Sequence, residues 1–322
     1  ASAEAPAAAK VSGNGGWERD VLEKLVFASI KEQRAARRWR FFSRLLWSVV
    51  VLLVLWAVFF KDTATKTSTS PHTAVVEIKG EIASGADASA EFVVAAMRSA
   101  FEDSGSRAVV LLINSPGGSP VQAGIINDEM TRLKAKYNKP LYAVVEESCA
   151  SAAYYIAAAA DEIFVDKASI VGSIGVLMDG FGFTGVMDKV GVERRLLTAG
   201  ENKGFLDPFS PMSAQQKEFA LQMLEQIHQQ FIGVVKAGRG DRLHETPEMF
   251  SGLFWTGQQA VELGLADKLG SLDFVAREVV KAEEVIDYTR RDNVAERLAK
   301  RFGAAIGEGS VKAMRGLVPS IR

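Results

Sequence analysis

The chain has 322 residues, of which 48% are hydrophobic, and its formal net charge at pH 7 is −1. A charge so close to zero argues against a generally basic, nucleic-acid-binding surface, and the single cysteine excludes an intramolecular disulfide. The three histidines are scattered, with no cysteine at ligand spacing, so neither a metal site nor a cofactor is expected. The first sixty residues lack a globular composition, which favours one sizeable α/β domain after them.

Residues 41–60 are predicted to form a transmembrane helix. The run from Leu45 to Phe60 contains no charge. Together with Phe41 and Phe42 it reaches about 20 residues, which is the length that a helix needs to cross ~30 Å of hydrocarbon. We therefore expect an uncleaved anchor in the lipid bilayer.

The charges that flank this run predict its orientation. Basic residues accumulate before it and are few after it: Lys31, Arg34, Arg37, Arg38, Arg40 and Arg44 precede it, and Lys61 and Lys66 follow beside Asp62. The positive-inside rule therefore places the N-terminus in the cytoplasm and the rest of the chain outside it. A cleavable signal peptide is the competing interpretation. It is disfavoured because about 40 residues precede the apolar run and no small-x-small cleavage site follows it.

The remaining segments divide by composition. Residues 1–40 are predicted to be a flexible tail followed by a cytoplasmic amphipathic segment, and residues 61–71 a polar linker. The main domain is expected over residues 72–288. Residues 289–322 are predicted to form a basic amphipathic tail, which we expect to contact the membrane or a neighbouring subunit.

Within the main domain, short β-branched runs alternate with longer helical patterns, which is typical of parallel strands joined by crossover helices. The predicted strands are Thr73–Ile78, Ala108–Ile113, Leu141–Val145, Glu162–Val165 and Ile174–Met178. The predicted helices are Ala88–Glu102, Pro120–Tyr137, Tyr154–Ala160, Met212–Ala237 and Gly257–Gly264, with Thr256 as the N-cap of the last.

Two of these strands end in loops that could carry chemistry. The strand ending at Ile113 is followed by a Pro-Gly-Gly turn at residues 116–118, whose glycines allow backbone N–H groups to point into a crevice. The next strand is followed by Ser151, which opens a helix at the same edge of the sheet. A nucleophile there would benefit from the helix dipole and from the N–H of Ala152. Taken singly, however, a plain turn and an ordinary N-cap remain open.

Taken together, the two loops resemble the Clp protease and crotonase superfold. The stretch from Ile113 to Gly118 and the small-residue helix after Ser151 carry this resemblance. Within that group, the serine, the segment Val171–Val176 about twenty residues later and then a lysine in a loop resemble the signal peptide peptidase A family. The resemblance covers roughly Thr73 to Tyr288. It implies that this α/β domain is a peptidase with the ββα units of the superfold.

The resemblance also implies a role for each site residue. Ser151 would be the nucleophile, Lys203 the general base and Ser173 the hydroxyl that orients the lysine, while Gly118 and Ala152 would supply the oxyanion-hole N–H groups. A Clp-type triad needs a histidine downstream of the serine, and none occurs between residues 151 and 210. Position alone does not distinguish the lysine in the loop from Lys167 or Lys189.

The sequence departs from the family at one point, because two alanines, Ala152 and Ala153, follow the serine where the family commonly has glycines. The extra methyl groups put the substrate range in doubt. Cys149 is an alternative nucleophile by position, but it has no histidine nearby and is expected to be a buried packing residue.

The family resemblance implies a membrane-anchored serine endopeptidase that degrades remnant signal peptides and related apolar peptides at the bacterial inner membrane. Its catalytic domain would be periplasmic, and a homo-oligomeric ring is expected in which serine and lysine come from adjacent copies. A catalytically silent membrane scaffold of the same fold is the alternative. A crotonase-like enzyme acting on acyl-CoA is a third interpretation, disfavoured because a domain outside the cytoplasm would meet no CoA.

Overall fold

The computed structural model of the protein describes residues 39–53 and 70–291. Contacts divide the chain into two units: the described part of one is a helix over residues 39–53, and that of the other comprises residues 70–291. Across these two ranges, no helix is both long enough and apolar enough to cross a membrane. The anchor predicted over residues 41–60 lies partly outside the described residues and stays a prediction, as do the assignments to 1–38, 61–69 and 292–322.

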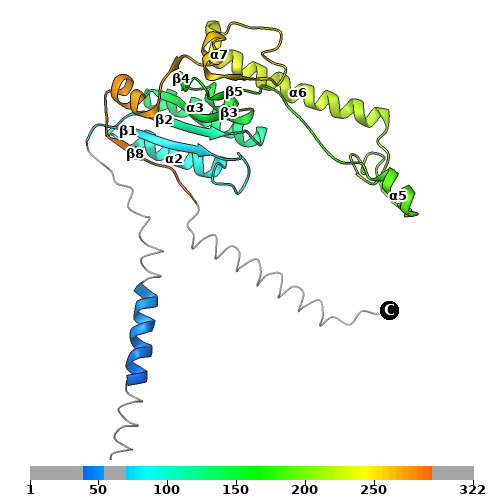
Figure 1. Cartoon of the computed structure of the whole chain (residues 1–322), viewed down its shortest axis with the longest axis horizontal. Helices are drawn as coiled ribbons and strands as arrows, with labels where there is room; N and C mark the ends of the chain where they lie inside the picture. The colour runs from blue at the N-terminus through cyan, green and yellow to red at the C-terminus, as the bar shows by residue number, and fades with distance from the viewer. Residues whose placement is uncertain (1–38, 54–69, 292–322) are drawn as a thin grey trace, which may run out of the picture. The chain divides into compact units, whose positions relative to one another are not determined.

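The second unit is built on an eight-stranded sheet (Figure 1). Its strands are β1 (His72–Lys79), β2 (Ser106–Ser115), β3 (Leu141–Ala150), β4 (Glu162–Val165), β5 (Ile170–Gly172), β6 (Phe254–Thr256), β7 (Lys268–Leu269) and β8 (Val285–Asp287). The order is β6-β5-β3-β2-β1-β8, with β4 between β3 and β7, and only the β5–β6 pair is antiparallel. The predicted α/β fold with a mostly parallel sheet is confirmed.

Helices connect the strands and cover both faces of the sheet. They are α2 (Ala90–Glu102), α3 (Pro120–Tyr137), α4 (Ala152–Ala157), α5 (Thr184–Val190), α6 (Ala214–Arg239), α7 (Gly257–Glu262) and α8 (Leu272–Phe274), with a 3-10 turn η1 (Gly240–Arg242) and a π-helical turn η2 (Val275–Val280). The predicted N-cap at Thr256 is confirmed, because its side chain accepts a hydrogen bond from the N–H of Gln259. Ser213 begins α6 with the same reciprocal capping arrangement.

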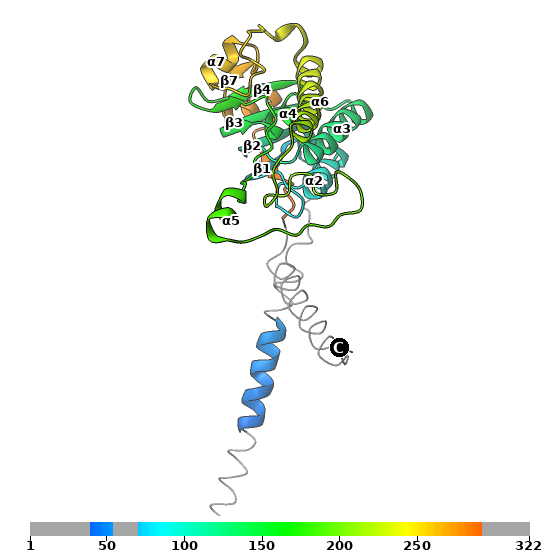
Figure 2. The same ribbon diagram turned by 90° about the vertical axis from the view of Figure 1, so that its right-hand side faces the viewer.

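The sheet separates two hydrophobic cores. The larger one lies between the strands and helices α2, α3, α4 and the end of α6, which gather on one side of the sheet in Figure 2. The smaller one lies on the opposite face, where Val275 of η2 packs with Val110, Val144 and Phe164. Because β1, β2 and β3 are covered on both faces, they read as nearly continuous apolar runs rather than alternating ones.

Helix α6 is docked by its C-terminal half alone. Its buried residues are Phe231, Val235 and Arg239. The guanidinium of Arg239 forms two hydrogen bonds with the carboxylate of Asp267, at 2.8 and 2.9 Å, and its side chain is fully buried. The first half of the helix has no buried residue and carries α5 and the preceding loop away from the sheet (Figure 1).

One predicted strand is wrong. The sequence predicts a strand over Ile174–Met178, whereas the structure forms β5 over Ile170–Gly172 and has no regular structure at residues 174–178. The cause is a reversal of the backbone: Gly172 has φ +107° and Ser173 has φ +52°, so the extended conformation ends there. The apolar residues that follow belong to a segment that leaves the sheet.

Candidate active site

Ser151 sits at a strained turn between β3 and α4. Its backbone has φ 53° and ψ −124°, a conformation that residues other than glycine rarely adopt. The turn is held from β5, because the N–H of Ser151 donates to the carbonyl of Gly172 at 2.8 Å. The side chain makes no capping hydrogen bond to α4, so the interpretation of Ser151 as an ordinary N-cap is not supported.

The Pro-Gly-Gly turn after β2 lies directly against this serine. A Cβ atom on Gly117 would come within 2.7 Å of Ser151 Cβ, so a larger residue would collide with the turn. The loop is fixed from the other side by Ile82, whose N–H donates to Gly117 at 2.9 Å and whose carbonyl accepts from Ser119 at 2.8 Å. Within the Pro-Gly-Gly turn, Gly117 is therefore the residue that brings the loop to Ser151.

Two backbone donors are left free beside the serine. Within the described part of the chain, no hydrogen bond occupies the N–H of Gly118 or that of Ala152, the first residue of α4. Free N–H groups at a helix N-terminus and a glycine turn are suited to stabilising a developing oxyanion. The alanines that replace the family's glycines are both buried in the larger core, Ala152 at 3% and Ala153 at 0% exposure, so their methyl groups serve packing.

Ser173 adjoins the residue that holds the Ser151 turn. It follows Gly172, and its own N–H donates to the carbonyl of Leu253, next to β6, at 2.8 Å. The indole of Trp255 in β6 packs on Gly172, where an added Cβ would lie 3.0 Å from the ring. Strand β6 thus supports the turn from behind, a role that its three residues do not reveal in the sequence.

Lys203 is not brought to Ser151 within one copy of the chain. It is exposed, in a loop that packs on the first half of α6 through Phe205 and Phe219, whose ring centroids are 5.7 Å apart. Farther toward its C-terminus, α6 contacts the segment after Ser173 through His228, whose ring nitrogen lies 3.1 Å from the carbonyl oxygen of Ile174. At 1.5 Å per residue, Phe219 lies about 14 Å farther along the helix. Figure 1 shows this region at the far end of α6 from the sheet.

Cys149 is buried in the core, and burial raises the pKa of its thiol far above its ordinary value. A thiol held in its neutral form is a poor nucleophile, so the packing role predicted for this residue fits its surroundings. Across residues 39–53 and 70–291, no group of three His, Cys, Asp or Glu side chains is placed to hold a metal ion.

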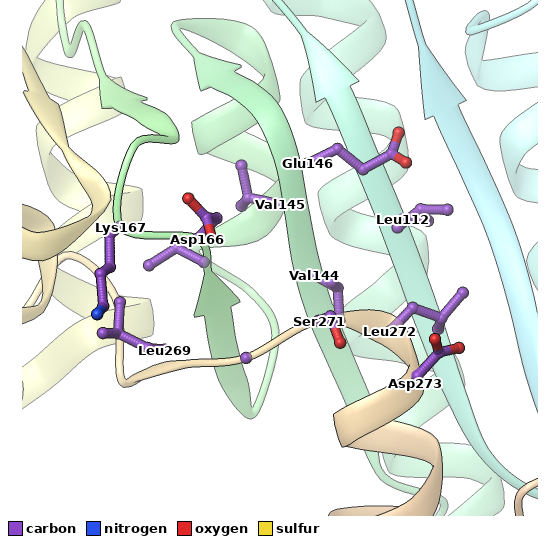
Figure 3. A pocket seen from close by; sticks show the side chains of 12 residues that line it. Leu112, Val144, Val145, Glu146, Asp166, Lys167, Leu269, Ser271, Leu272 and Asp273 are labelled. Atoms are coloured by element: carbon purple, nitrogen blue, oxygen red, sulfur yellow. The ribbon is translucent and has the colours of Figure 1, made fainter.

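Two cavities lie apart from the serine. One, of about 380 Å³, opens on the sheet face that carries α8, between the middle of β3, the end of β4 and the loop before α8 (Figure 3). Its floor includes Leu112 and Val144, and Glu146, Lys167 and Asp273 are placed around it. The other, of about 430 Å³, is lined by Asn202 and Phe205 of the loop and by Phe219 and its neighbours at the start of α6. Neither contains any of the predicted site residues.

Comparisons with known proteins agree with this architecture. Residues 133–286 match the model of peptidase family S49. The chain is 31% identical over 222 residues to a protein of Methanocaldococcus jannaschii named as a protease, covering 67% of this chain and 71% of that protein. It is 30% identical over 227 residues to Protease 4 of Haemophilus influenzae, covering 69% of this chain and 36% of that protein. The chain belongs to peptidase family S49, and the predicted likeness to signal peptide peptidase A is confirmed.

A further relative has a different name. The chain is 47% identical over 176 residues to the Na(+)/H(+) antiporter NhaA of Brucella melitensis, which covers 55% of this chain and 24% of that protein. The chain therefore spans about a quarter of that relative's length, and the name of the whole protein describes more than the matched part.

Proposed function

We propose that this chain is a serine endopeptidase of the Clp/crotonase-like superfold in which Ser151 is the nucleophile. The observation that carries the proposal is the strained Ser151 turn, packed against Gly117 and flanked by the free N–H groups of Gly118 and Ala152. A serine held at positive φ beside two unoccupied donors is better suited to acyl transfer than to packing.

In the proposed reaction, Ser151 Oγ attacks the scissile carbonyl carbon while its proton passes to the neutral amine of Lys203. The N–H groups of Gly118 and Ala152 stabilise the tetrahedral oxyanion. The lysine then returns the proton to the departing amine, leaving an acyl-enzyme. Water hydrolyses this ester with the same lysine as base, and Ser173 orients the amine by a hydrogen bond.

Lys203 is proposed to come from a neighbouring copy in a homo-oligomeric ring. The position of its loop supports this, because the first half of α6 carries the loop away from its own serine. The segment that precedes Lys203 is also unusually apolar for a surface. Leu177 and Phe181 are 79% exposed and Leu197 is 95% exposed, as expected of a surface that another copy covers.

The proposed substrates are apolar peptides at a membrane, including remnant signal peptides. Two things support this: a relative from Enterococcus faecium named as a signal peptide peptidase, 31% identical over 188 residues, and the apolar run over residues 41–60. We place the protein in the bacterial inner membrane through that segment, with the N-terminus in the cytoplasm and the catalytic domain in the periplasm.

Turnover of a fluorogenic peptide with a small apolar residue before the scissile bond tests the proposal. Detergent-purified Ser151→Ala and Lys203→Ala variants should lose at least about a thousandfold in kcat while remaining folded and assembled. Lys189→Ala is the matched control, because Lys189 is an exposed lysine in the same projecting segment, and it should retain activity.

Two outcomes would overturn the assignment. Activity that survives Ser151→Ala would place the nucleophile elsewhere. A parent protein that is silent across varied apolar peptides, although assembled, would favour the alternative of a membrane scaffold without turnover.

A further inference from the structure

Three polar side chains that are distant in the sequence meet at the opposite end of the sheet from Ser151. His72 is the first residue of β1, Tyr288 directly follows β8, and Asp103 ends α2. His72 Nε2 lies 3.0 Å from the hydroxyl of Tyr288, which in turn donates to Asp103 Oδ2 at 2.6 Å. The imidazole of His72 is fully buried, and its Nδ1 lies 2.9 Å from the carbonyl oxygen of Ser70.

The number of protons in this chain of contacts is fixed by what each group can donate. The carbonyl of Ser70 only accepts, so His72 Nδ1 must carry a proton. The tyrosine has a single proton, and it cannot serve both His72 and an ionised Asp103. A neutral His72, a neutral Tyr288 and an ionised Asp103 together have too few protons for the contacts Ser70–His72, His72–Tyr288 and Tyr288–Asp103. All three contacts can be hydrogen bonds only if the network holds one further proton.

The position of that extra proton follows from Asp103. Burial raises the pKa of this carboxyl and hydrogen bonds from Tyr288 and from the N–H of Gly105 lower it, and the net result is a pKa below its ordinary value. Asp103 is thus ionised and accepts from Tyr288. With Asp103 ionised, all three hydrogen bonds form only when the imidazole donates from both nitrogens, as imidazolium. When it loses that proton, two acceptors face a single hydroxyl hydrogen, and one of the two contacts becomes repulsive.

The strand beside this network is short, and the residues that flank it also bind β1, through the hydroxyl of Thr73, which donates to the carbonyl of Ala282, and the N–H of Glu77, which donates to the hydroxyl of Thr289. Strand β8 has three residues and pairs only with Thr73, Ala74 and Val75 of β1. Just beyond it, the N–H of Tyr288 donates to the carbonyl of Val75 at 2.8 Å. Among the strands that the structure describes, β8 is at the edge of the sheet, so releasing it would expose the backbone of β1.

We propose that His72, Tyr288 and Asp103 form a proton-dependent latch that holds edge strand β8 on β1 and α2 and loosens when His72 loses its second ring proton. The latch therefore weakens as the pH rises. It lies outside the proposed catalytic site and does not depend on the assignment of Ser151 or Lys203.

Other charges surround the latch and set its balance. The ammonium of Lys139 donates to the backbone carbonyl of Asp103 at 2.8 Å, and the carboxylate of Glu284 accepts from the hydroxyl of Ser70 at 2.7 Å. Arg290 binds the hydroxyl of Ser99 on α2. The carboxylates of Asp103 and Glu284 favour the imidazolium form, whereas the burial of the ring and the cations Lys139 and Arg290 oppose it.

Amide hydrogen exchange of residues 285–288 in the full-length, detergent-purified protein tests the latch. After correction for the intrinsic pH dependence of exchange, their protection should fall about tenfold between about pH 5 and pH 8, as expected for the loss of one charge-assisted hydrogen bond. Amides of the buried strand β2 should show no such change.

The informative variant is Tyr288→Phe, which keeps the ring and removes the shared hydroxyl. It should have low protection of residues 285–288 at both pH values, with a change of less than about twofold. Tyr137→Phe is the matched control, because that hydroxyl contacts Lys136 and Glu102 rather than the latch, and it should keep the parent's behaviour. A parent without pH dependence, or a Tyr288→Phe variant that retains it, would overturn the proposal.

Discussion

The turn that carries Ser151 and the loop that carries Lys203 are built in opposite ways. The turn is held from β5 through Gly172, from the glycine loop through Gly117, and from the core through Ala152. The loop around Lys203 is exposed. It packs on the half of α6 that has no buried residue and on the projecting segment before it, where the N–H of Phe183 donates to the carbonyl of Pro208. One copy of the chain therefore fixes the proposed nucleophile and the proposed oxyanion donors, whereas the proposed base lies where, in the proposed ring, a second copy would complete the site.

The two halves of α6 give the largest contrast that mutation can test. Phe231 is 4% exposed and its ring lies 5.3 Å from that of Tyr155, whereas Phe219 is 59% exposed. Phe231→Ala should lower the free energy of unfolding by about 3–5 kcal/mol because it leaves a cavity in the core. Phe219→Ala in dissociated protein should cost about 1 kcal/mol or less. Chemical denaturation measures both, and equal losses would contradict the division of the helix.

The fixed half of the site is most sensitive at Gly118. A Cβ at this position would collide with the carbonyl oxygen of Ile82, and the backbone has φ +148°, so Gly118→Ala must displace the loop and its free N–H. We expect kcat to fall by about 10²–10³, the cost of losing one oxyanion donor. Gly124→Ala is the control, because nothing lies within 4 Å of its added Cβ, and it should leave kcat unchanged. A fully active Gly118→Ala variant would show that the N–H of Gly118 does not stabilise the oxyanion.

A smaller, pH-dependent effect is expected in the helical layer behind the turn. Hydrogen bonds from Arg132, and then from Arg98, lower the pKa of Glu129 from its ordinary value to about 2. Because the folded-state pKa is depressed, this carboxylate stabilises the protein above about pH 4.5, and the contribution is lost as the pH falls toward 2.

Glu129→Gln tests this contribution. The variant should unfold with about 1–2 kcal/mol less free energy at pH 7, a modest loss because both arginine side chains are about half exposed. The difference in melting temperature from the parent should narrow steadily between about pH 4.5 and pH 2. A constant difference over that range would show that the ion pairs do not cause it.

Much of this fold follows from patterns that are local in the sequence. The β-branched runs predict β1 to β4. Both ends of α3 are also predicted correctly, because Ser119 is its N-cap, Pro120 is its first residue and Asn138 is its left-handed C-cap. The strand predicted at Ile174–Met178 is wrong because no local pattern announces a serine at positive φ, as found at Ser173. Its neighbours decide that conformation, above all the bond from Ser173 N–H to Leu253, eighty residues later in the chain.

The candidate site divides in the same way. Ser151, Gly118 and Ala152 follow strand ends, and parallel strands bring their carboxyl ends to one edge of a sheet, so their proximity can be predicted. The contribution of Gly117 and the support from Trp255 depend on packing between distant segments. The contact between His72 and Tyr288 in the proposed latch cannot be predicted from the sequence, because the two residues are separated by 216 positions and neither belongs to a motif.

The central claim, that serine and lysine come from different copies, is tested most directly by mixing two inactive variants. Ser151→Ala protein retains Lys203, and Lys203→Ala protein retains Ser151. Co-assembled in equal amounts, they should recover about a quarter of the parent's turnover, because that fraction of random interfaces joins an intact serine to an intact lysine. If co-assembly is verified and the mixture remains as inactive as either variant alone, the two residues act within one chain or not together at all, and the account is contradicted.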